Sequence, residues 1–365
     1  MRIRRPRREA STSQQERPPV VARVEDVVTR SLTRFLRSRG QQAHFVPYTG
    51  IGVAGVDGDG WVRVFGRAML SRRAGAEVRP SKRRGWRQFF TAPLFEGEVV
   101  VTVRGVEHRC TADRQGYLDA RLPTDLGAGW HDVAFRVGDG PTTLGKVVMV
   151  GGEGGLGIVS DIDDTVLVTS LPRPLIAAWN TFVRHQRARR AVVGMAQLYR
   201  DVQAAHPDTP VVYLSTGAWN TWVTLADFLA RFGYPAGPLL LTDWGPTQTG
   251  WFRSGPEHKA RELDRLAVDL PQIRWLLVGD DGQHDPRLYA EFAARSPERV
   301  TAIAIRQLSP AEQVLAHGTP QPRPDAERPE DERTFRPVVR SGDGNGLRDE
   351  LAREVPGLLE PVPST

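Results

Sequence analysis

The chain has 365 residues, 40% of them hydrophobic and 25% charged, which is enough apolar material for two globular domains. Its single cysteine, Cys110, excludes an intrachain disulfide and a cysteine-built zinc site, and no apolar run reaches the roughly 18 to 20 residues that span a bilayer. The net charge of +6 suits an anionic partner such as a membrane surface, and because no zinc-finger, helix-turn-helix or RNA-binding motif is present we expect no nucleic-acid partner.

Residues 1–20 are rich in Arg, Pro, Ser and Gln and lack hydrophobic periodicity, which predicts a disordered basic tail. The segment 21–40 has apolar residues at helical spacing and ends at Gly40, which predicts an amphipathic helix that also carries arginines. Two interpretations stay open: the helix docks on a domain, or it rests on anionic lipid. Because no secretory signal is found, we expect a cytoplasmic protein, peripheral at the inner membrane face under the second interpretation.

From 45 to 150 the sequence changes to short strand-like segments separated by glycine turns. The predicted strands are Trp61–Arg67, Glu98–Arg104, Tyr117–Leu122, His131–Val137 and Lys146–Val150. Their spacing predicts a small antiparallel β-sandwich-like domain. Basic residues between 67 and 84 form either a solvated face or a binding site. The glycine-rich segment 151–155 is a linker, because it precedes the next strand and lacks the lysine-hydroxyl end of a phosphate-binding loop.

Beyond 156, predicted strands and helices alternate, which indicates an α/β domain over 156–310 with a parallel sheet covered on both faces. The strands are expected at 157–161, 210–215, 238–242, 273–279 and 299–305, and the helices at 174–188, 194–205, 220–231, 257–268 and 286–295. Ligands bind such sheets outside the carboxyl ends of the strands. The segment 318–365 is rich in proline and charge through residue 340, which predicts a mostly disordered tail with a short helix over Leu347–Leu359.

Four segments place polar side chains at the carboxyl edge of the predicted sheet, three at strand ends and one at the start of a helix. Asp161 and Asp163 close the first strand, and because they are two residues apart both carboxylates leave on the same side. Two carboxylates this close repel each other unless a cation lies between them or one is protonated. Ser215-Thr216-Gly217 closes the second strand, Lys259 lies in the turn that opens a helix, and Asp280 to Asp285 follow the fourth strand.

These residues fit the hydrolysis of a phosphate ester. Asp161 would attack phosphorus to form an aspartyl-phosphate, while Asp163 would protonate the leaving oxygen and later accept a proton from water. Hard carboxylate oxygens select Mg²⁺, and Asp161, Asp280 and the backbone carbonyl of Asp163 would hold it. Asp285 would orient a metal-bound water. Lys259 would neutralise the nucleophile and the phosphoryl oxygens.

The loop after the second strand would bind the phosphoryl oxygens. The Ser215 hydroxyl and the backbone amides of Thr216 and Gly217 are the expected donors. Asn220 either caps the helix that follows or touches the substrate.

Residues 156 to about 306 resemble a haloacid dehalogenase (HAD) superfamily phosphatase. Four motifs are similar to the actin-patch-associated phosphatidate phosphatase catalytic family: Ser160–Val166, Ser215–Asn220, His258-Lys259 and Gly279–Pro286. The resemblance implies a Rossmann-like HAD sheet, Mg²⁺ dependence, and phosphatidate or a related lipid phosphate as substrate. Bacterial members of the family carry an amino-terminal β-rich region, and the scarcity of lysine beside arginine also indicates a GC-rich bacterial genome. This chain has Ser215-Thr216-Gly217 where family members often have Ser-Ser-Pro, which keeps the first hydroxyl.

We therefore expect a Mg²⁺-dependent phosphatase that acts on a lipid phosphate. Two alternatives stay open: the same chemistry on a soluble sugar, nucleotide or protein phosphate, or a non-catalytic adaptor with a phosphatase fold. The apolar and basic segment 174–190 either packs beside the site or forms a rim for a membrane-held head group. His258 and His284 are either hydrogen-bonded neighbours of the site or acid-base groups. Four tryptophans are either core or interfacial: Trp219, Trp222, Trp244 and Trp251.

Overall fold

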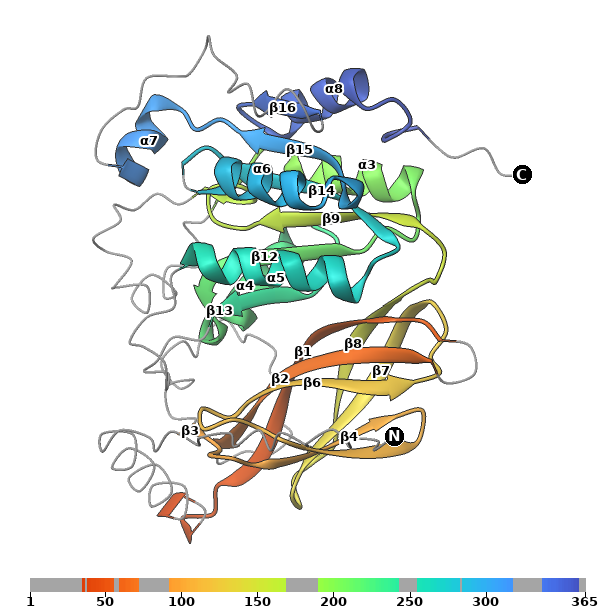
Figure 1. Ribbon diagram of the computed structural model, residues 1–365. Helices are drawn as coiled ribbons and strands as arrows, with labels where there is room; N and C mark the ends of the chain where they lie inside the picture. Colours follow the sequence, from red (N-terminus) through yellow and green to blue (C-terminus); the bar gives the residue numbers. More distant parts are fainter. Residues whose placement is uncertain are drawn as a thin grey trace, which may run out of the picture.

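The computed structural model describes residues 35–36, 38–55, 59–71, 92–168, 190–242, 255–282, 284–317 and 337–360. The structure contains two large sheets, a β-rich sheet below and a parallel sheet with its helices above (Figure 1). The predicted mixed α/β class, with a parallel sheet that follows a β-rich part, is confirmed.

The β-rich sheet contains eight strands and is curled. They are β1 Gln42–Val53, β2 Gly60–Ser71, β3 Ala92–Pro93, β4 Glu98–Val103, β5 Val106–Thr111, β6 Tyr117–Thr124, β7 Gly129–Val137 and β8 Thr143–Val150. Their order is β3-β2-β1-β8-β7-β4-β5, with β6 paired to β2. The described pairs are antiparallel except β1 with β8. The predicted antiparallel sandwich is therefore corrected to one curled sheet with a parallel pair.

The β-rich sheet has its own apolar core. Val62 and Val64 of β2 alternate with their neighbours and bury against Val99 and Val101 of β4 and Phe135 of β7. Their neighbours Trp61 and Phe65 point to the other face of the strand and are buried in the core shared with the parallel sheet and its helices, so β2 is buried on both faces. The edge strand β5 is mostly exposed and carries charged residues, which disfavours pairing with another chain.

The parallel sheet contains six strands in the order β13-β12-β9-β14-β15-β16. They are β9 Gly155–Asp161, β12 Val211–Ala218, β13 Leu239–Thr242, β14 Ile273–Asp280, β15 Val300–Arg306 and β16 Val338–Ser341, and a separate two-stranded ladder joins β10 Leu167–Val168 to β11 Arg190–Ala191. All neighbours in the six-stranded sheet run parallel. Because β12 and β14 flank β9, the carboxyl ends of these three strands meet at one edge.

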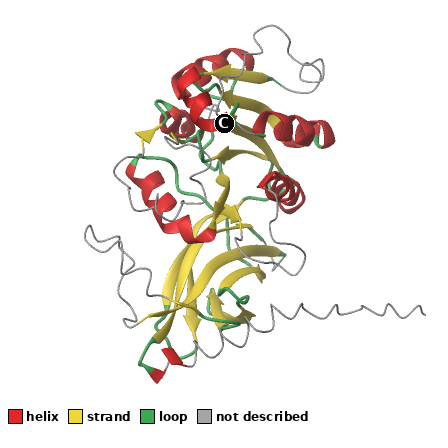
Figure 2. Ribbon diagram, turned by 90° about the vertical axis from the view of Figure 1, so that its left-hand side faces the viewer, coloured by secondary structure: helices red, strands yellow, loops and turns green. Residues whose placement is uncertain are grey.

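Helices cover both faces of the parallel sheet (Figure 2). They are α3 Met195–Ala205, η4 Trp219–Thr221, α4 Trp222–Arg231, α5 Gly255–Asp269, α6 Asp285–Arg295, η5 Pro297–Arg299, α7 Pro310–His317 and α8 Gly344–Glu354. Apolar residues of α3, α4 and α8 share one core cluster, and those of α5 and α6 share another. Each of these helices buries one apolar face, and α3 is an example, with buried residues at helical spacing: Met195, Leu198, Tyr199 and Val202.

The carboxyl-terminal segment is more ordered than its composition predicts. Val338–Ser341 forms β16 at the edge of the parallel sheet, and Gly344–Glu354 forms α8, so the predicted disorder of 318–365 is wrong for residues 337–360. Asp343 caps α8 by accepting a hydrogen bond from the Gly346 amide at 3.0 Å. The predicted helix over Leu347–Leu359 therefore begins and ends earlier.

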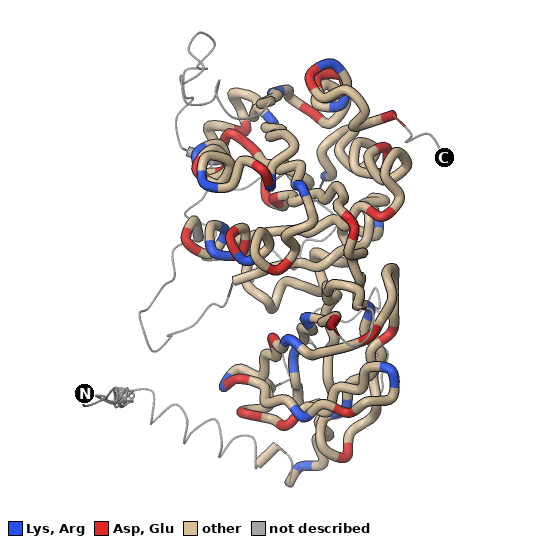
Figure 3. Tube along the Cα trace, turned by 45° about the vertical axis from the view of Figure 1, so that its right-hand side comes forward, with Lys and Arg blue, Asp and Glu red and all other residues tan. Residues whose placement is uncertain are grey.

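Other predictions lie outside the described residues. These are the tail 1–20, most of the helix 21–40, the basic residues 72–84, the segment 174–189, Trp244, Trp251 and the tail 318–336. Along the described chain, Lys and Arg are interspersed with Asp and Glu (Figure 3). Within this part of the chain, the helices are all too short or too polar to cross a bilayer.

Candidate active site

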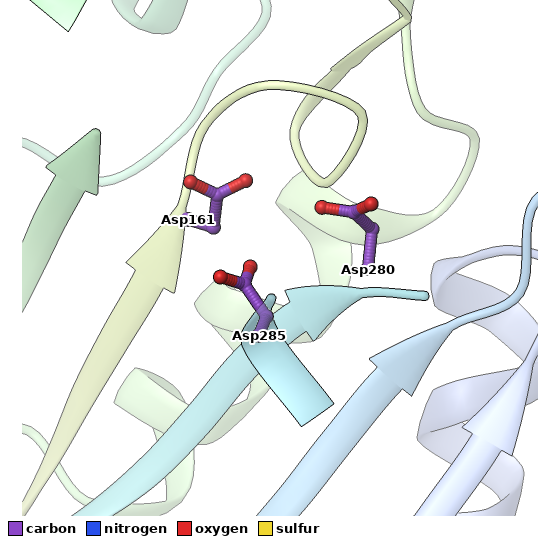
Figure 4. A group of neighbouring side chains, drawn as sticks. All are labelled: Asp161, Asp280 and Asp285. Carbon is purple, nitrogen blue, oxygen red and sulfur yellow. The ribbon is translucent and has the colours of Figure 1, made fainter. Parts of the chain in front are cut away.

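Three carboxylates converge at the carboxyl edge of the parallel sheet (Figure 4). Asp161 ends β9, Asp280 ends β14, and Asp285 begins α6. One carboxylate oxygen from each lies within 4.8 Å of the others, and all three side chains are buried. The predicted meeting of these three residues follows from the strand order, because β9 and β14 are neighbours.

Lys259 supplies the positive charge of this cluster from the first turns of α5. Its Nζ lies 2.6 Å from Asp161 Oδ1 and 2.7 Å from Asp285 Oδ1, and the side chain is buried. Burial disfavours the charged amine, but the two carboxylates prevail and raise the pKa of Lys259 above its usual value. The lysine is therefore protonated at neutral pH.

One ammonium does not balance three buried carboxylates. Burial raises the pKa of Asp161 to about 8 against the opposing effect of Lys259, with further rises from Asp285 and Asp163. Burial, followed by Asp285 and Asp161, holds the pKa of Asp280 well above its usual value. The cluster therefore takes up protons unless a cation joins it.

The cluster fits a divalent cation of the hard, oxygen-binding kind. Asp285 Oδ2 is buried and has no hydrogen-bond partner among the described residues, which leaves it free to ligate. Thr165 Oγ1 lies 3.3 Å from Asp161 Oδ2 and 3.5 Å from Asp280 Oδ2, so it joins these carboxylates. Gly279 makes room for the group, because a Cβ there would lie 2.6 Å from Asp285 Oδ2.

The hydroxyl loop, Ser215–Gly217, was predicted to follow the strand but lies in the last residues of β12, where the pairing with β13 is irregular. It contacts the second predicted aspartate. Ser215 Oγ donates to Asp163 Oδ2 at 3.1 Å and accepts from the Gly217 amide at 2.9 Å. The Thr216 carbonyl accepts from Thr242 Oγ1 at 2.8 Å. Among the described residues, Asp163 is not part of the three-carboxylate group; its carboxylate faces the hydroxyl loop instead.

Asn220 does not cap the following helix. The N-cap of α4 is Thr221, whose hydroxyl donates to the Ala218 carbonyl at 2.7 Å, and no side chain caps the helix. Asn220 lies in η4 with an exposed side chain. The cap prediction is therefore wrong, and contact with substrate stays a prediction.

His258 lies beside Lys259 but is occupied by structural contacts. Its Nδ1 is 3.1 Å from an Arg261 guanidinium nitrogen, and its Nε2 is 3.5 Å from the Leu240 carbonyl. Arginine can only donate, so Nδ1 accepts and the proton resides on Nε2. Burial lowers the pKa of His258 to about 4. These contacts favour the hydrogen-bonded neighbour over an acid-base group.

Two aspartates in the loops beside the site are held by hydrogen bonds. Asp281 Oδ1 accepts a hydrogen bond from the Leu308 amide at 2.8 Å. Asp164 has a positive φ of 60°, and its carbonyl accepts from Arg306 at 2.7 Å. His284 precedes α6 at the N-cap without a side-chain cap bond.

Sequence reasoning missed a buried pair behind Asp161. Tyr199 Oη lies 2.6 Å from Ser160 Oγ, which donates to the Asp161 carbonyl at 2.7 Å. The pair fixes the backbone at the end of β9 from the side of α3. Only the apolar spacing of α3 was available in the sequence, and it identifies Tyr199 as core without indicating its partner.

The parallel sheet, the lysine-bridged carboxylates and the hydroxyl loop together form a site that is suited to phosphoryl chemistry. Residues 156–307 match the family model described as phosphatidate phosphatase APP1, catalytic domain, which confirms the resemblance drawn from the four motifs. The match covers this segment and not the β-rich sheet.

Two fungal relatives align with the same part of the chain. Phosphatidate phosphatase APP1 of Saccharomyces cerevisiae is 26% identical over 153 residues, which are 42% of this chain and 26% of that protein. An uncharacterised protein of Schizosaccharomyces pombe is 28% identical over 163 residues, 42% of this chain and 25% of that protein. The chain thus spans about a quarter of the length of these curated relatives.

A carbohydrate acetylesterase from Xanthomonas citri aligns with 70% of this chain and 66% of its own, at 11% identity and a TM-score of 0.25. That score is too low to carry an argument about fold or function.

Proposed function

We propose that the chain hydrolyses a phosphomonoester through an aspartyl-phosphate on Asp161, with Mg²⁺ as cofactor and a lipid phosphate as substrate. The observation that carries the proposal is the Lys259 ammonium, 2.6 Å from Asp161 and 2.7 Å from Asp285 in a buried carboxylate cluster. The family match over 156–307 supports the lipid substrate. The parallel strand order supports a HAD-type Rossmann-like arrangement.

Two aspartates would share the chemistry. An Asp161 oxygen attacks phosphorus as the bond to the ester oxygen breaks, and Asp163 gives its proton to that oxygen. Water then attacks the phosphorus of the aspartyl-phosphate, Asp163 accepts the proton, and phosphate leaves with Asp161 restored. Ser215 Oγ, 3.1 Å from Asp163 Oδ2, fixes the orientation of the acid-base carboxyl.

Lys259 would offset negative charge on the transferred group throughout both steps. The Thr216 amide would bind a phosphoryl oxygen, with Asn220 near the substrate. The Ser215 hydroxyl and the Gly217 amide would also bind phosphoryl oxygens by exchanging their present bonds to Asp163 and Ser215 for bonds to the substrate. Held by Asp161, Asp280, Asp285 and the Asp163 carbonyl, Mg²⁺ would supply the positive charge that lets one anion attack another.

The test is phosphate release from phosphatidate in mixed detergent micelles, with Mg²⁺ and with a chelator. We expect release only with Mg²⁺, and none from Asp161→Asn. A panel of soluble sugar, nucleotide and protein phosphates runs in parallel. Turnover of the panel but not of phosphatidate would replace the lipid with a soluble substrate. No release from any substrate would leave the adaptor as the better interpretation.

We also infer a cytoplasmic location, with peripheral contact at the inner membrane face, and a division into domains at 45–150 and 156–310. Support comes from the basic character of the chain and from the two separate sheets. Sedimentation with vesicles of anionic and of neutral lipid tests the contact, since binding to both or to neither would argue against it.

A further inference from the structure

The β-rich sheet touches the two elements that carry the phosphoryl-binding groups. The first is the segment η4 and α4, which directly follows the hydroxyl loop Ser215–Gly217. The second is α5, whose first turns present Lys259. The contacts are made by side chains of β1, β2 and β6, which are far from the site in sequence.

Tyr48 of β1 holds the first element by ring stacking. Its ring centroid lies 5.3 Å from that of Trp219 and 4.6 Å from that of Trp222, with interplanar angles of 6° and 23°. Phe65 and Tyr117 lie 6.0 and 6.2 Å from the Trp219 ring. Aromatic pairs at these separations are favourable. Trp219 is only two residues after Gly217, the last residue of the hydroxyl loop. The position of the loop therefore depends on the β-rich sheet.

Arg63 of β2 holds the second element by a buried ion pair. Its Nη1 lies 3.1 Å from Glu262 Oε2, and both side chains are buried. Asp119 on β6 fixes the guanidinium from the other side through two bonds of 2.8 and 2.7 Å. Glu262 is one helical turn beyond Lys259 on α5, so this bond limits the rotation and sliding of the helix that presents the lysine.

We propose that the β-rich sheet is a positioning element for catalysis, in which Tyr48 places the hydroxyl loop and Arg63 places Lys259. The inference rests on the proposed function for its kinetic consequence only. Among the described residues, no hydrogen bond, ion pair or ring contact joins Tyr48 or Arg63 to β9, β14 or α6, which carry the three carboxylates. The Tyr48 contact thus acts on the hydroxyl loop and leaves the three carboxylates in place, whereas the Arg63 contact reaches Asp161 and Asp285 through Lys259.

The kinetic test is Tyr48→Leu in the full-length chain. A displacement of about 1 Å at the reacting groups lowers rates by up to about 100-fold, so we expect kcat to fall by about 10- to 100-fold. The Mg²⁺ concentration for half-maximal activity should stay within about twofold of wild type, because the carboxylates do not move. Tyr48→Phe, which keeps the stacked ring, should restore most of kcat.

The matched control is Phe135→Leu. Phe135 is a buried ring of the same sheet and stacks on Phe45 at 4.7 Å, but it belongs to the core of that sheet alone. It should lower the unfolding midpoint to a similar extent and leave kcat within about twofold of wild type. Equal losses of kcat in both leucine variants would mean that Tyr48 contributes stability only, and would overturn the proposal.

Hydrogen exchange tests the same proposal without any substrate. In Tyr48→Leu, amides of 215–231 should exchange faster, while those of 155–161 and 273–280 keep wild-type protection. Glu262→Gln removes the charge that pairs with Arg63 and leaves the ring contacts of Tyr48 intact. In this variant the faster exchange should appear in 255–269. Unchanged exchange at both segments overturns the positioning role even if the enzyme is active. Local loosening in a chain that releases no phosphate would support positioning and reject the proposed activity.

Discussion

Lys259 is the residue whose removal should have the largest and most diagnostic effect on stability. Lys259→Met keeps the length and apolar stem of the side chain but removes the ammonium that lies 2.6 Å from Asp161 and 2.7 Å from Asp285. Three buried carboxylates within 4.8 Å of one another are then left without a cation. Removing one partner of a buried ion pair destabilises a protein by about 3 to 5 kcal/mol. We expect a loss in this range at pH 7.5 in the presence of chelator.

The pH dependence of this loss has a definite sign. Burial already raises the pKa of Asp161 to about 8, and without Lys259 it should rise further. A carboxyl group whose pKa is higher in the folded state than in the unfolded chain stabilises the fold at low pH, and this stabilisation is lost as pH rises through the folded pKa. The variant should therefore be closest to wild type near pH 5 and furthest from it near pH 8.

The assay is urea unfolding followed by circular dichroism, with chelator and with saturating Mg²⁺. Because the variant cluster is more negative, Mg²⁺ should raise its free energy of unfolding more than that of wild type. Lys146→Met is the control, since Lys146 lies 2.9 Å from Asp132 in an exposed pair worth about 0 to 1 kcal/mol. A loss below about 1 kcal/mol for Lys259→Met, or equal stabilisation of both proteins by Mg²⁺, would refute this account of the charge balance.

Three further outcomes are expected. Asp280→Asn should weaken Mg²⁺ binding by about tenfold or more, measured by isothermal titration. The free energy of unfolding in chelator should hold or rise, because Asn cannot ionise in the buried cluster whereas Asp280 must stay protonated there or carry an unbalanced charge. Gly279→Ala should lower the free energy of unfolding by about 1 to 3 kcal/mol in urea, since the new Cβ would lie 2.6 Å from Asp285 Oδ2 and 2.8 Å from Tyr289 Cε2. The pKa of His258 is lowered to about 4, so below pH 6.5 the unfolded chain binds the proton more tightly than the folded protein. The free energy of unfolding of wild type should therefore fall by about 2 kcal/mol between pH 7 and pH 5, and His258→Gln should lack this decrease.

The convergence of the carboxylates could be predicted because it depends only on strand order. Asp161 and Asp280 each close an apolar run, and a parallel sheet brings the ends of neighbouring strands together. Lys259 was identified by its rarity and its place at a helix start. Its pairing with Asp161 was expected from the charge of the nucleophile. Its pairing with Asp285 was not expected, because this pair depends on the rotation of α5 about its axis, which Glu262 and Arg63 help to set.

Other features depend on tertiary contacts that leave no local pattern. Val338–Ser341 follows a charged, proline-rich stretch, and it becomes a strand because β15 offers it an unpaired edge. The curl of the β-rich sheet requires β1 to pair in parallel with β8, a contact between residues about a hundred positions apart. Asn220 is a residue type that often caps helices, but it lies in η4, one residue before Thr221, the N-cap of α4.

The charges of the cluster indicate why a fold would keep such an arrangement. Asp161, Asp280 and Asp285 carry three negative charges when ionised, and Lys259 returns one, so the buried group has an excess of two. One divalent cation neutralises that excess, whereas two would reverse it. A neutral centre can then receive a phosphomonoester anion without repelling it, with Ser215 and the loop amides to bind the added oxygens. Under the proposed mechanism, the raised pKa of Asp161 describes the cluster without a bound cation, and a single divalent cation would return Asp161 to the ionised state that nucleophilic attack requires.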